Sequence, residues 1–158
     1  MILYHGSNVS VENPKIIPNN RVLDFGCGFY LTSDYEQAAR WAKLTVLRRG
    51  TGVPTVTTYE FENIDSDLSV LTFDSANVNW LKYVVSNRSD ITNKDDYDIV
   101  VGPVANDNTM PVITLYLSGA YDESEALKRL LTQKLKDQYA FKSEKALTKL
   151  KFKEVITI

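Results

Sequence analysis

Residues able to do nucleophilic or metal chemistry are scarce in this sequence. Its 158 residues include one histidine, His5, and one cysteine, Cys27. A structural zinc site takes four cysteine or histidine ligands, so these two residues cannot build one. A Ser-His-Asp or Cys-His catalytic arrangement would have to use His5. Cys27 alone cannot form an internal disulfide, which is typical of a reducing compartment. The composition therefore directs attention to His5 and its neighbours.

The histidine stands at the end of a predicted strand. Residues 2–5 are apolar enough for a short buried strand, and Gly6 and Ser7 follow as a turn. A glycine at such a place lets a ligand approach the backbone closely. A lone histidine in an arbitrary protein is more often a partly buried residue bonded to a nearby carbonyl. The meaning of His5 therefore depends on the motifs that accompany it.

A second group of residues forms a predicted turn with two glycines, residues 24–28, followed by a predicted strand at 29–32. No third glycine follows at the right place and a strand comes next, so this turn is not a dinucleotide-binding fingerprint. On the strand, Phe29 alternates to the face opposite Tyr30 and is predicted to be a core residue. Cys27, between two glycines, is predicted to be a small buried residue.

The rest of the chain mixes helices and strands without strict alternation, which predicts one α+β domain over residues 1–158. A helix is expected from Ser33, its N-cap, to Arg48 and Arg49, with Glu36 completing a capping box. The remaining expected strands are 55–61, 68–73, 97–101, 138–141 and 152–158, and the remaining helices are 76–87, a short one near Pro111, 123–135 and 143–150.

Charge and hydropathy exclude several classes of protein. The chain has 18 Lys and Arg against 20 Asp and Glu, a net charge of −2, which gives no general attraction to nucleic acid or anionic membranes. The N-terminus lacks the basic and apolar regions of a signal peptide, and no stretch approaches about 20 apolar residues. We therefore expect a cytoplasmic protein that does not enter membranes.

Four blocks in order resemble the ADP-ribosyltransferase superfamily. They are Leu3 to Ser7 (L-Y-H-G-S), Asp24 to Thr32 (D-F-G-C-G-F-Y-L-T), Gln37 to Ala42 and Gln138 to Leu150. Specifically, the chain resembles the branch of diphtheria toxin and poly(ADP-ribose) polymerase, and within it a small bacterial family of unknown function. The resemblance spans essentially the whole chain and implies a split β-sheet core with peripheral helices.

The resemblance also implies roles for residues at the first two blocks, with NAD as substrate and no metal. His5 would hydrogen-bond the adenosine-side ribose as a positioning residue. Gly6 would offer its N–H and C=O to the nicotinamide carboxamide, and Ser7 could bond the same group. Tyr30 would stack on the nicotinamide ring, with Tyr35 one candidate for the second wall.

The third catalytic position is Gln138, where active members of the superfamily usually have a glutamate that stabilises developing positive charge. Glutamine can bond the ribose hydroxyl without bringing a charge, which favours transfer of single ADP-ribose units. Glu144 is close in sequence but belongs to the following predicted helix. Arg21 is a candidate to meet the NAD pyrophosphate, and Asp24 is expected to cap the glycine turn or to act on the acceptor.

The function that the resemblance implies is NAD-dependent mono-ADP-ribosyl transfer to an unidentified protein or nucleic-acid acceptor. A bacterial toxin or phage-defence effector, neutralised by an antitoxin-like protein partner, is the corresponding biological role. Two alternatives stay open: an inactive module that binds NAD or ADP-ribose, and an NAD glycohydrolase. The glutamine at position 138 is the feature that separates transfer from inactive binding.

Overall fold

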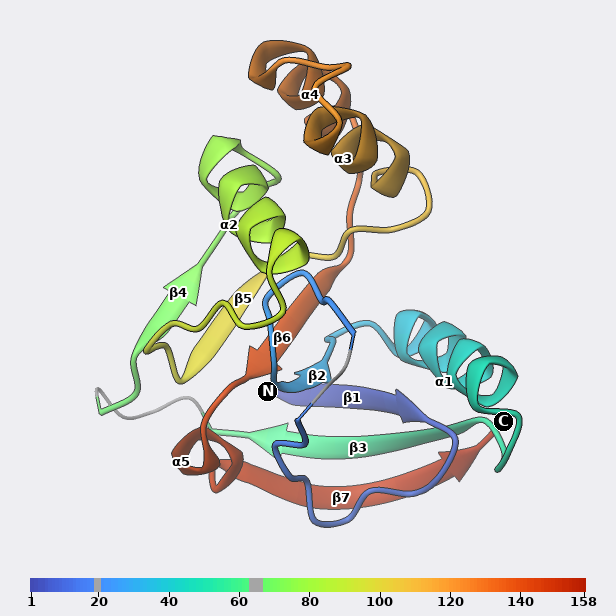
Figure 1. Cartoon of the computed structure of the whole chain (residues 1–158). Helices are drawn as coiled ribbons and strands as arrows, with labels where there is room; N and C mark the ends of the chain where they lie inside the picture. The colour runs from blue at the N-terminus through green and yellow to red at the C-terminus, as the bar shows by residue number, and fades with distance from the viewer. Residues whose placement is uncertain (19–20, 63–66) are drawn as a thin grey trace.

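The computed structural model describes residues 1–18, 21–62 and 67–158. Within these ranges the chain forms two β-sheets and five helices, so the α+β class predicted from the sequence is confirmed. The first sheet lies across the lower part of the molecule in Figure 1, and the second sheet rises from it toward helices α2, α3 and α4. The two sheets meet where strands β1 and β2 lie side by side.

The first sheet is antiparallel and has the strand order β1-β3-β7. Its central strand carries a nearly continuous run of buried residues, because it is paired on both edges. Tyr4 of β1 lies opposite Thr58 of β3, which lies opposite Glu154 of β7. The strands are β1 (Ile2–Ser7), β3 (Thr55–Phe61) and β7 (Leu150–Thr157).

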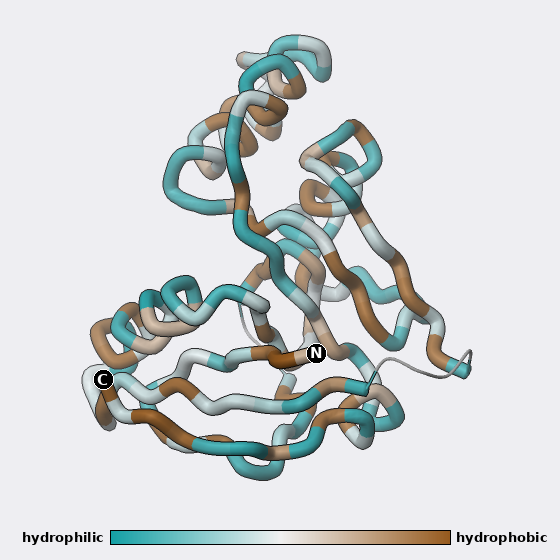
Figure 2. The backbone as a smooth tube through the Cα atoms, turned by 180° about the vertical axis from the view of Figure 1, so that it is seen from behind, coloured by the Kyte–Doolittle hydropathy of each residue, from teal (hydrophilic) through white to brown (hydrophobic). Residues whose placement is uncertain are grey.

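The second sheet has the strand order β2-β6-β5-β4, with only the β4 and β5 pair parallel. Figure 2 shows hydrophobic stretches along the neighbouring strands β4 and β5. Tyr30 of β2 lies opposite Ala140 of β6, which places Gln138 two residues from that pair and on the same face. The strands are β2 (Phe29–Leu31), β4 (Val70–Thr72), β5 (Ile99–Pro103) and β6 (Asp137–Phe141).

Helix α1 (Tyr35–Arg49) packs on β1, and α2 (Val78–Ser89), α3 (Met110–Leu117) and α4 (Glu123–Leu130) gather beyond the second sheet (Figure 1). A short helix, α5 (Glu144–Leu147), joins β6 to β7. One core, which includes Trp80 and Val100, fills the space between these three helices and the second sheet. Another, which includes Leu3 and Phe141, lies between the two sheets.

Three local expectations are corrected by the structure. The N-cap of α1 is Asp34, whose carboxylate accepts the Gln37 N–H at 2.8 Å. Ser33, expected to be that cap, instead donates its N–H and hydroxyl to the carboxylate of Asp137 on β6. Cys27, expected to be buried, is exposed because its turn lies on the surface.

The other predicted elements are present with shifted ends. The helix expected over 123–135 ends at Leu130, and the strand expected over 97–101 starts at Ile99 and continues to Pro103. Phe29 is buried in the core between the sheets, as predicted. In the described part of the chain, no helix has the length and apolar character needed to cross a membrane.

Candidate functional site

The two sheets separate from one another at Gly6. Tyr4 and Thr32 exchange two backbone hydrogen bonds, of 2.8 and 3.0 Å, and form an isolated bridge between β1 and β2. Continuation of this antiparallel ladder would pair Gly6 with Tyr30. Instead the Tyr30 carbonyl accepts a hydrogen bond from Nδ1 of His5 at 2.8 Å. Strands β1 and β2 therefore diverge at this point, which we call the Gly6 split.

The Gly6 peptide groups face the split. Along an antiparallel strand, the N–H and C=O groups of successive residues point to opposite sides, so those of residues two apart point to the same side. Those of Tyr4 bond Thr32, the residue that follows β2, so those of Gly6, two residues further on, point to the same side and away from β3. A donor and an acceptor next to one another form the complement of a carboxamide group.

The ring of His5 is held in one tautomer beside the split. The Tyr30 carbonyl is only an acceptor, so Nδ1 carries the proton. Burial lowers the pKa of His5 to about 4, the carbonyl opposes that shift and the Arg49 charge adds to it. The imidazole is therefore neutral at physiological pH, and Nε2 is a hydrogen-bond acceptor. Stacking on Phe29, with ring centroids 4.2 Å apart, fixes the ring plane.

Gly6 is also required by the packing of α1 on β1. A Cβ atom at this position would lie 1.9 Å from the carbonyl oxygen of Ala38 and 2.8 Å from the backbone nitrogen of Ala42. Both contacts are to helix backbone, so an added Cβ would force the whole helix to shift. From the sequence, glycine at position 6 was expected to let a ligand approach the backbone. The close contact between β1 and α1 is a second reason for a glycine at this position.

Tyr30 is clamped by the glycine turn that precedes it in the chain. Its hydroxyl donates to the Gly26 carbonyl at 2.7 Å and accepts the Phe25 N–H at 3.1 Å. Burial, with a contribution from the negative charge of Asp24, raises the pKa of Tyr30 well above its ordinary value, so the phenol stays neutral. The ring is fixed at its hydroxyl end beside the split.

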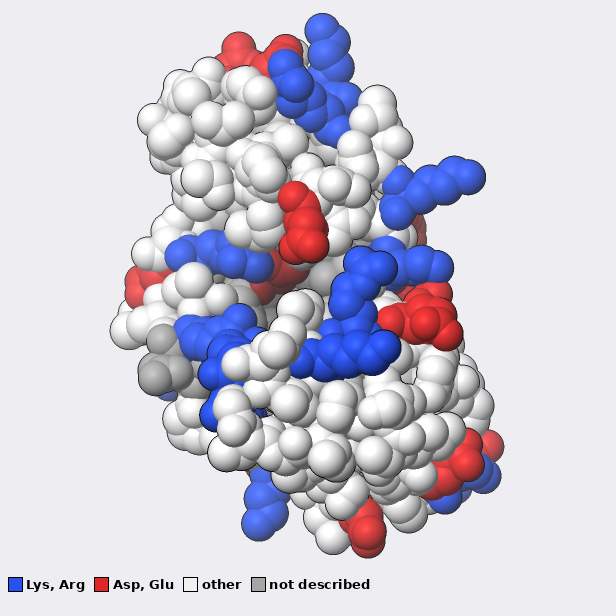
Figure 3. Space-filling view, turned by 90° about the vertical axis from the view of Figure 1, so that its right-hand side faces the viewer, with Lys and Arg blue, Asp and Glu red and all other residues white. Residues whose placement is uncertain are grey.

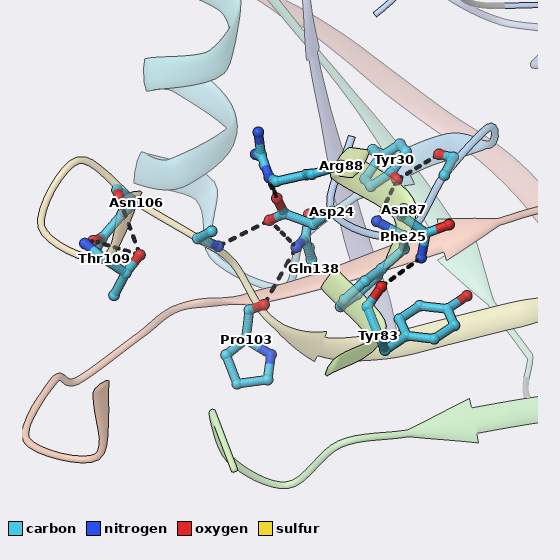
Figure 4. A network of polar contacts seen from close by, with 12 residues as sticks. Asp24, Phe25, Tyr30, Tyr83, Asn87, Arg88, Pro103, Asn106, Thr109 and Gln138 are labelled. Carbon is cyan, nitrogen blue, oxygen red and sulfur yellow. Dashed lines mark hydrogen bonds and ion pairs between the residues drawn. The ribbon is translucent and has the colours of Figure 1, made fainter. Parts of the chain in front are cut away.

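Gln138 belongs to a buried network centred on Asp24 (Figure 4). Its Nε2 donates to Asp24 Oδ2 at 2.8 Å and to the Pro103 carbonyl at 3.3 Å. The Ala105 N–H donates to the same Oδ2 at 3.0 Å. Oδ1 accepts from Nε and Nη2 of Arg88 at 2.7 and 2.5 Å. Asp24 is 4% exposed, so its charge is compensated by these partners rather than by water.

The remaining candidates lie around these two centres. Ser7 is buried, and its hydroxyl bonds Asn8 Oδ1 at 3.4 Å. Tyr35, at the start of α1, contacts the ring of Tyr4 edge to face, with centroids 5.5 Å apart. Arg21 is exposed and, together with Gly26, lines a small hollow beside the glycine turn. Glu144 lies on α5, as expected from its position after the strand.

Basic side chains gather on one face of the molecule near the site. Figure 3 shows Lys and Arg grouped across the middle of the face on which α1 lies, next to a hollow between the upper and lower parts. Desolvation lowers the pKa of Arg48, and the neighbouring positive charges of Arg21 and Arg49 lower it further. These three arginines therefore share one electrostatic environment. The exposed basic residues of α1 are Arg40, Lys43, Arg48 and Arg49.

The structure thus brings together most, but not all, of the residues selected from the sequence. Gly6 is next to His5, which bonds the Tyr30 carbonyl, and Gln138 is joined to Tyr30 through the turn formed by residues 24–26. The imidazole of His5 lies on the opposite face of β1 from Gly6 and reaches the split through Tyr30. Tyr35 contacts the ring of Tyr4, and no ring contact with Tyr30 is present among the described residues.

Arg88 was missed by sequence reasoning, and Asp24, expected to cap the glycine turn, has a carboxylate that accepts instead from Arg88, Gln138 and the Ala105 N–H. Arg88 lies in the last turn of α2, where a basic residue is ordinary because it complements the helix dipole. Its contact with Asp24 joins residues 64 positions apart in the chain. The D-F-G block marked Asp24, but nothing in the sequence connected it with Gln138. Among the described residues, no group of three or more His, Cys, Asp or Glu could hold a metal ion.

The fold and the site define an α+β protein whose two sheets part beside a neutral histidine and a clamped tyrosine. Comparison with family models assigns the chain to a family. It belongs to the family described as "Protein of unknown function (DUF3990)", whose model matches residues 1–152. Neither the curated proteins nor the solved structures gave a match.

Proposed function

We propose that this protein is an NAD-dependent mono-ADP-ribosyltransferase that moves ADP-ribose from NAD to a macromolecular acceptor and releases nicotinamide. The observation that supports this most is the Gly6 split, where the pairing of β1 and β2 stops and the Gly6 peptide is directed toward the side on which β2 and Tyr30 lie. A carboxamide placed there would accept from the Gly6 N–H and donate to its C=O, while its ring lies against Tyr30.

The neighbouring groups suit the rest of the NAD molecule. Nε2 of His5 is an acceptor for a ribose hydroxyl, because the proton is held on Nδ1. Arg21, Arg48 and Arg49 supply positive charge for a pyrophosphate. In the reaction, the bond between nicotinamide nitrogen and ribose breaks, the electron pair leaves with nicotinamide, and a nucleophilic atom of the acceptor attacks the cationic ribose carbon and releases its proton to solvent. The site residues then act by positioning and electrostatics rather than as nucleophiles.

The test is incubation of the protein with NAD labelled in the adenine part and with a cell lysate. Wild-type protein is expected to label macromolecules and to release nicotinamide. Tyr30→Ala is expected to lower release at least about tenfold, because it removes the ring against which nicotinamide stacks. Asp98→Asn is the matched control, since Asp98 bonds Ser143 and Ser69 at the far end of β5 and touches none of the site residues.

Other outcomes point to the alternative functions. Nicotinamide release without labelled macromolecules, in wild type and not in Tyr30→Ala, would show an NAD glycohydrolase. Calorimetric binding of NAD with no turnover would show a binding module. Absence of both binding and turnover would overturn the proposal. The proposed role as a toxin with an antitoxin-like partner predicts that expression arrests growth and that Tyr30→Ala relieves the arrest.

A further inference from the structure

We infer that Asp24 is a positioning residue of this site, which orients the amide of Gln138 and holds the turn that clamps Tyr30. The inference rests on the proposed function. It assigns a role to the carboxylate of Asp24, which bonds Gln138, the residue proposed for the third catalytic position. Asp24 touches both parts of the site: its side chain bonds Gln138, and the two residues after it bond the hydroxyl of Tyr30.

The orientation of the Gln138 amide follows from its two partners. Both the Asp24 carboxylate and the Pro103 carbonyl can only accept hydrogen bonds. The donor end, Nε2, must therefore face them, and Oε1 must point away from them. Because both acceptors require it, this orientation does not depend on how an amide is assigned. Gln138 thus presents an acceptor oxygen, the group that binds a ribose hydroxyl.

The glycine turn is anchored by the same carboxylate. Asp24 is tied to two other segments, since Oδ1 accepts from Arg88 on α2 and Oδ2 accepts the Ala105 N–H after β5. These contacts anchor the start of the turn, whose next two residues bond the Tyr30 hydroxyl. Loss of the carboxylate would release the turn and the amide together, although Asp24 lies on neither β2 nor β6.

The contacts of Asp24 also explain why glutamine occupies position 138. A glutamate in the same pose would bring its carboxylate to the place of Nε2, 2.8 Å from Asp24 Oδ2 and 3.3 Å from the Pro103 carbonyl. Two carboxylates and a carbonyl would then face one another without a donor between them. The glutamate usual in the superfamily is therefore incompatible with Asp24, and Gln138 is its matched partner.

A double-mutant cycle of Asp24→Asn, Gln138→Glu and the combined variant tests the inference. Each single change leaves two donors or two acceptors facing one another. In the combined variant the asparagine introduced at position 24 can donate to the carboxylate at position 138, so this one hydrogen bond returns with its direction reversed, while the Ala105 N–H loses its acceptor and the Pro103 carbonyl loses the donor from position 138. We expect each single variant to lose about tenfold or more in the kcat of nicotinamide release, and the double variant to exceed the product of the two losses at least about fivefold.

Two further measurements separate positioning from simple stability. Thermal midpoints are recorded for all variants, and Asp98→Asn controls for the loss of a structural carboxylate. We expect that control to lower the midpoint without a selective fall in kcat. Asp24→Asn with unchanged kcat, or a double variant equal to the product of its parents, would overturn the inference while leaving the proposed function intact.

The inference and the proposed function fail in different ways. A wild type that binds NAD without turnover would reject transfer, and the same cycle, read as NAD dissociation constants by calorimetry, would still test Asp24. Recovery of affinity in the double variant would then support the positioning role, and additive losses would reject it. A wild type that neither binds nor turns over NAD would overturn both.

Discussion

The Gly6 split and the neighbouring Asp24 network differ in how their polar groups are bonded. At the split, the His5 ring is neutral, Tyr30 is neutral, and the Gly6 peptide is left without a strand partner on one side. In the Asp24 network the carboxylate is buried, its cation Arg88 is only partly exposed, and both carboxylate oxygens are bonded to protein donors. Backbone with open hydrogen-bonding capacity can receive a ligand, whereas a satisfied network can only hold other groups in place.

This difference separates the residues that would touch NAD from those that would position them. In the proposed function, Gly6, Tyr30 and Nε2 of His5 are the groups that would contact NAD. Asp24 and Arg88 lie behind Gln138 and act through it. Substitutions in the two regions should therefore have different consequences for stability and for activity.

The largest loss of stability is expected for Gly6→Ala. The added Cβ would meet the Ala38 carbonyl at 1.9 Å, so α1 must move away from β1, at a cost of about 3 kcal/mol or more. Gly50→Ala is the control: Gly50 has a φ of 69°, but nothing lies within 4 Å of a Cβ there, so we expect about 1 kcal/mol. Free energies of unfolding in urea measure both. Equal losses would show that Gly6 is not in close contact with the helix.

Arg88→Met should be the next most costly change, because it leaves the Asp24 carboxylate buried without its cation. We expect a loss of about 3 kcal/mol in the free energy of unfolding. Arg129→Met removes a comparable ion pair, to Glu125 at 2.8 Å, but these side chains are 51% and 37% exposed. That control should lose less than about 1 kcal/mol. Similar losses in the two variants would contradict the view that the Asp24 carboxylate is shielded from water.

A smaller effect is expected from the protonation of His5. Its folded pKa of about 4 lies below the ordinary value of 6.5, so the unfolded chain binds more protons between these pH values. This contribution to stability is complete above pH 6.5 and is lost as pH falls toward 4. We expect a loss of about 2 kcal/mol after allowance for partial exposure.

The control for this prediction is His5→Asn, whose side-chain amide can donate to the Tyr30 carbonyl without titrating. Urea unfolding of both proteins at several pH values across the range between the two pKa values measures the difference. We expect wild type to lose more stability than His5→Asn as the pH falls. Parallel pH dependences would place the imidazole in solvent rather than against Phe29.

The parts of this fold that follow from local sequence patterns were predictable. The apolar spacing behind Tyr35 predicts α1, because one face of this helix is buried, and alternation in residues 55–61 predicts β3, although that strand is buried on both faces. The choice of Asp34 over Ser33 as N-cap was not predictable, since both residue types cap helices. Asp137 on a distant strand decides it by taking the Ser33 side chain.

The site was predictable only in its residue types. The four blocks selected Gly6, Tyr30 and Gln138, but the way in which they are held depends on contacts between distant segments. Arg88 carries no signal beyond that of a basic helix end, and its partner lies 64 residues away in the chain. Such pairings are set by the packing of α2 on the second sheet, which no local pattern encodes.

Hydrogen exchange at the Gly6 amide tests the central claim most directly. In the free protein, this amide should exchange faster than those of His5 and Ser7, which point toward β3 in the antiparallel ladder. Addition of NAD should shift the Gly6 resonance and slow its exchange, as the carboxamide takes the place of the missing strand partner. A Gly6 amide already protected in the free protein, or unchanged by saturating NAD, would contradict the account.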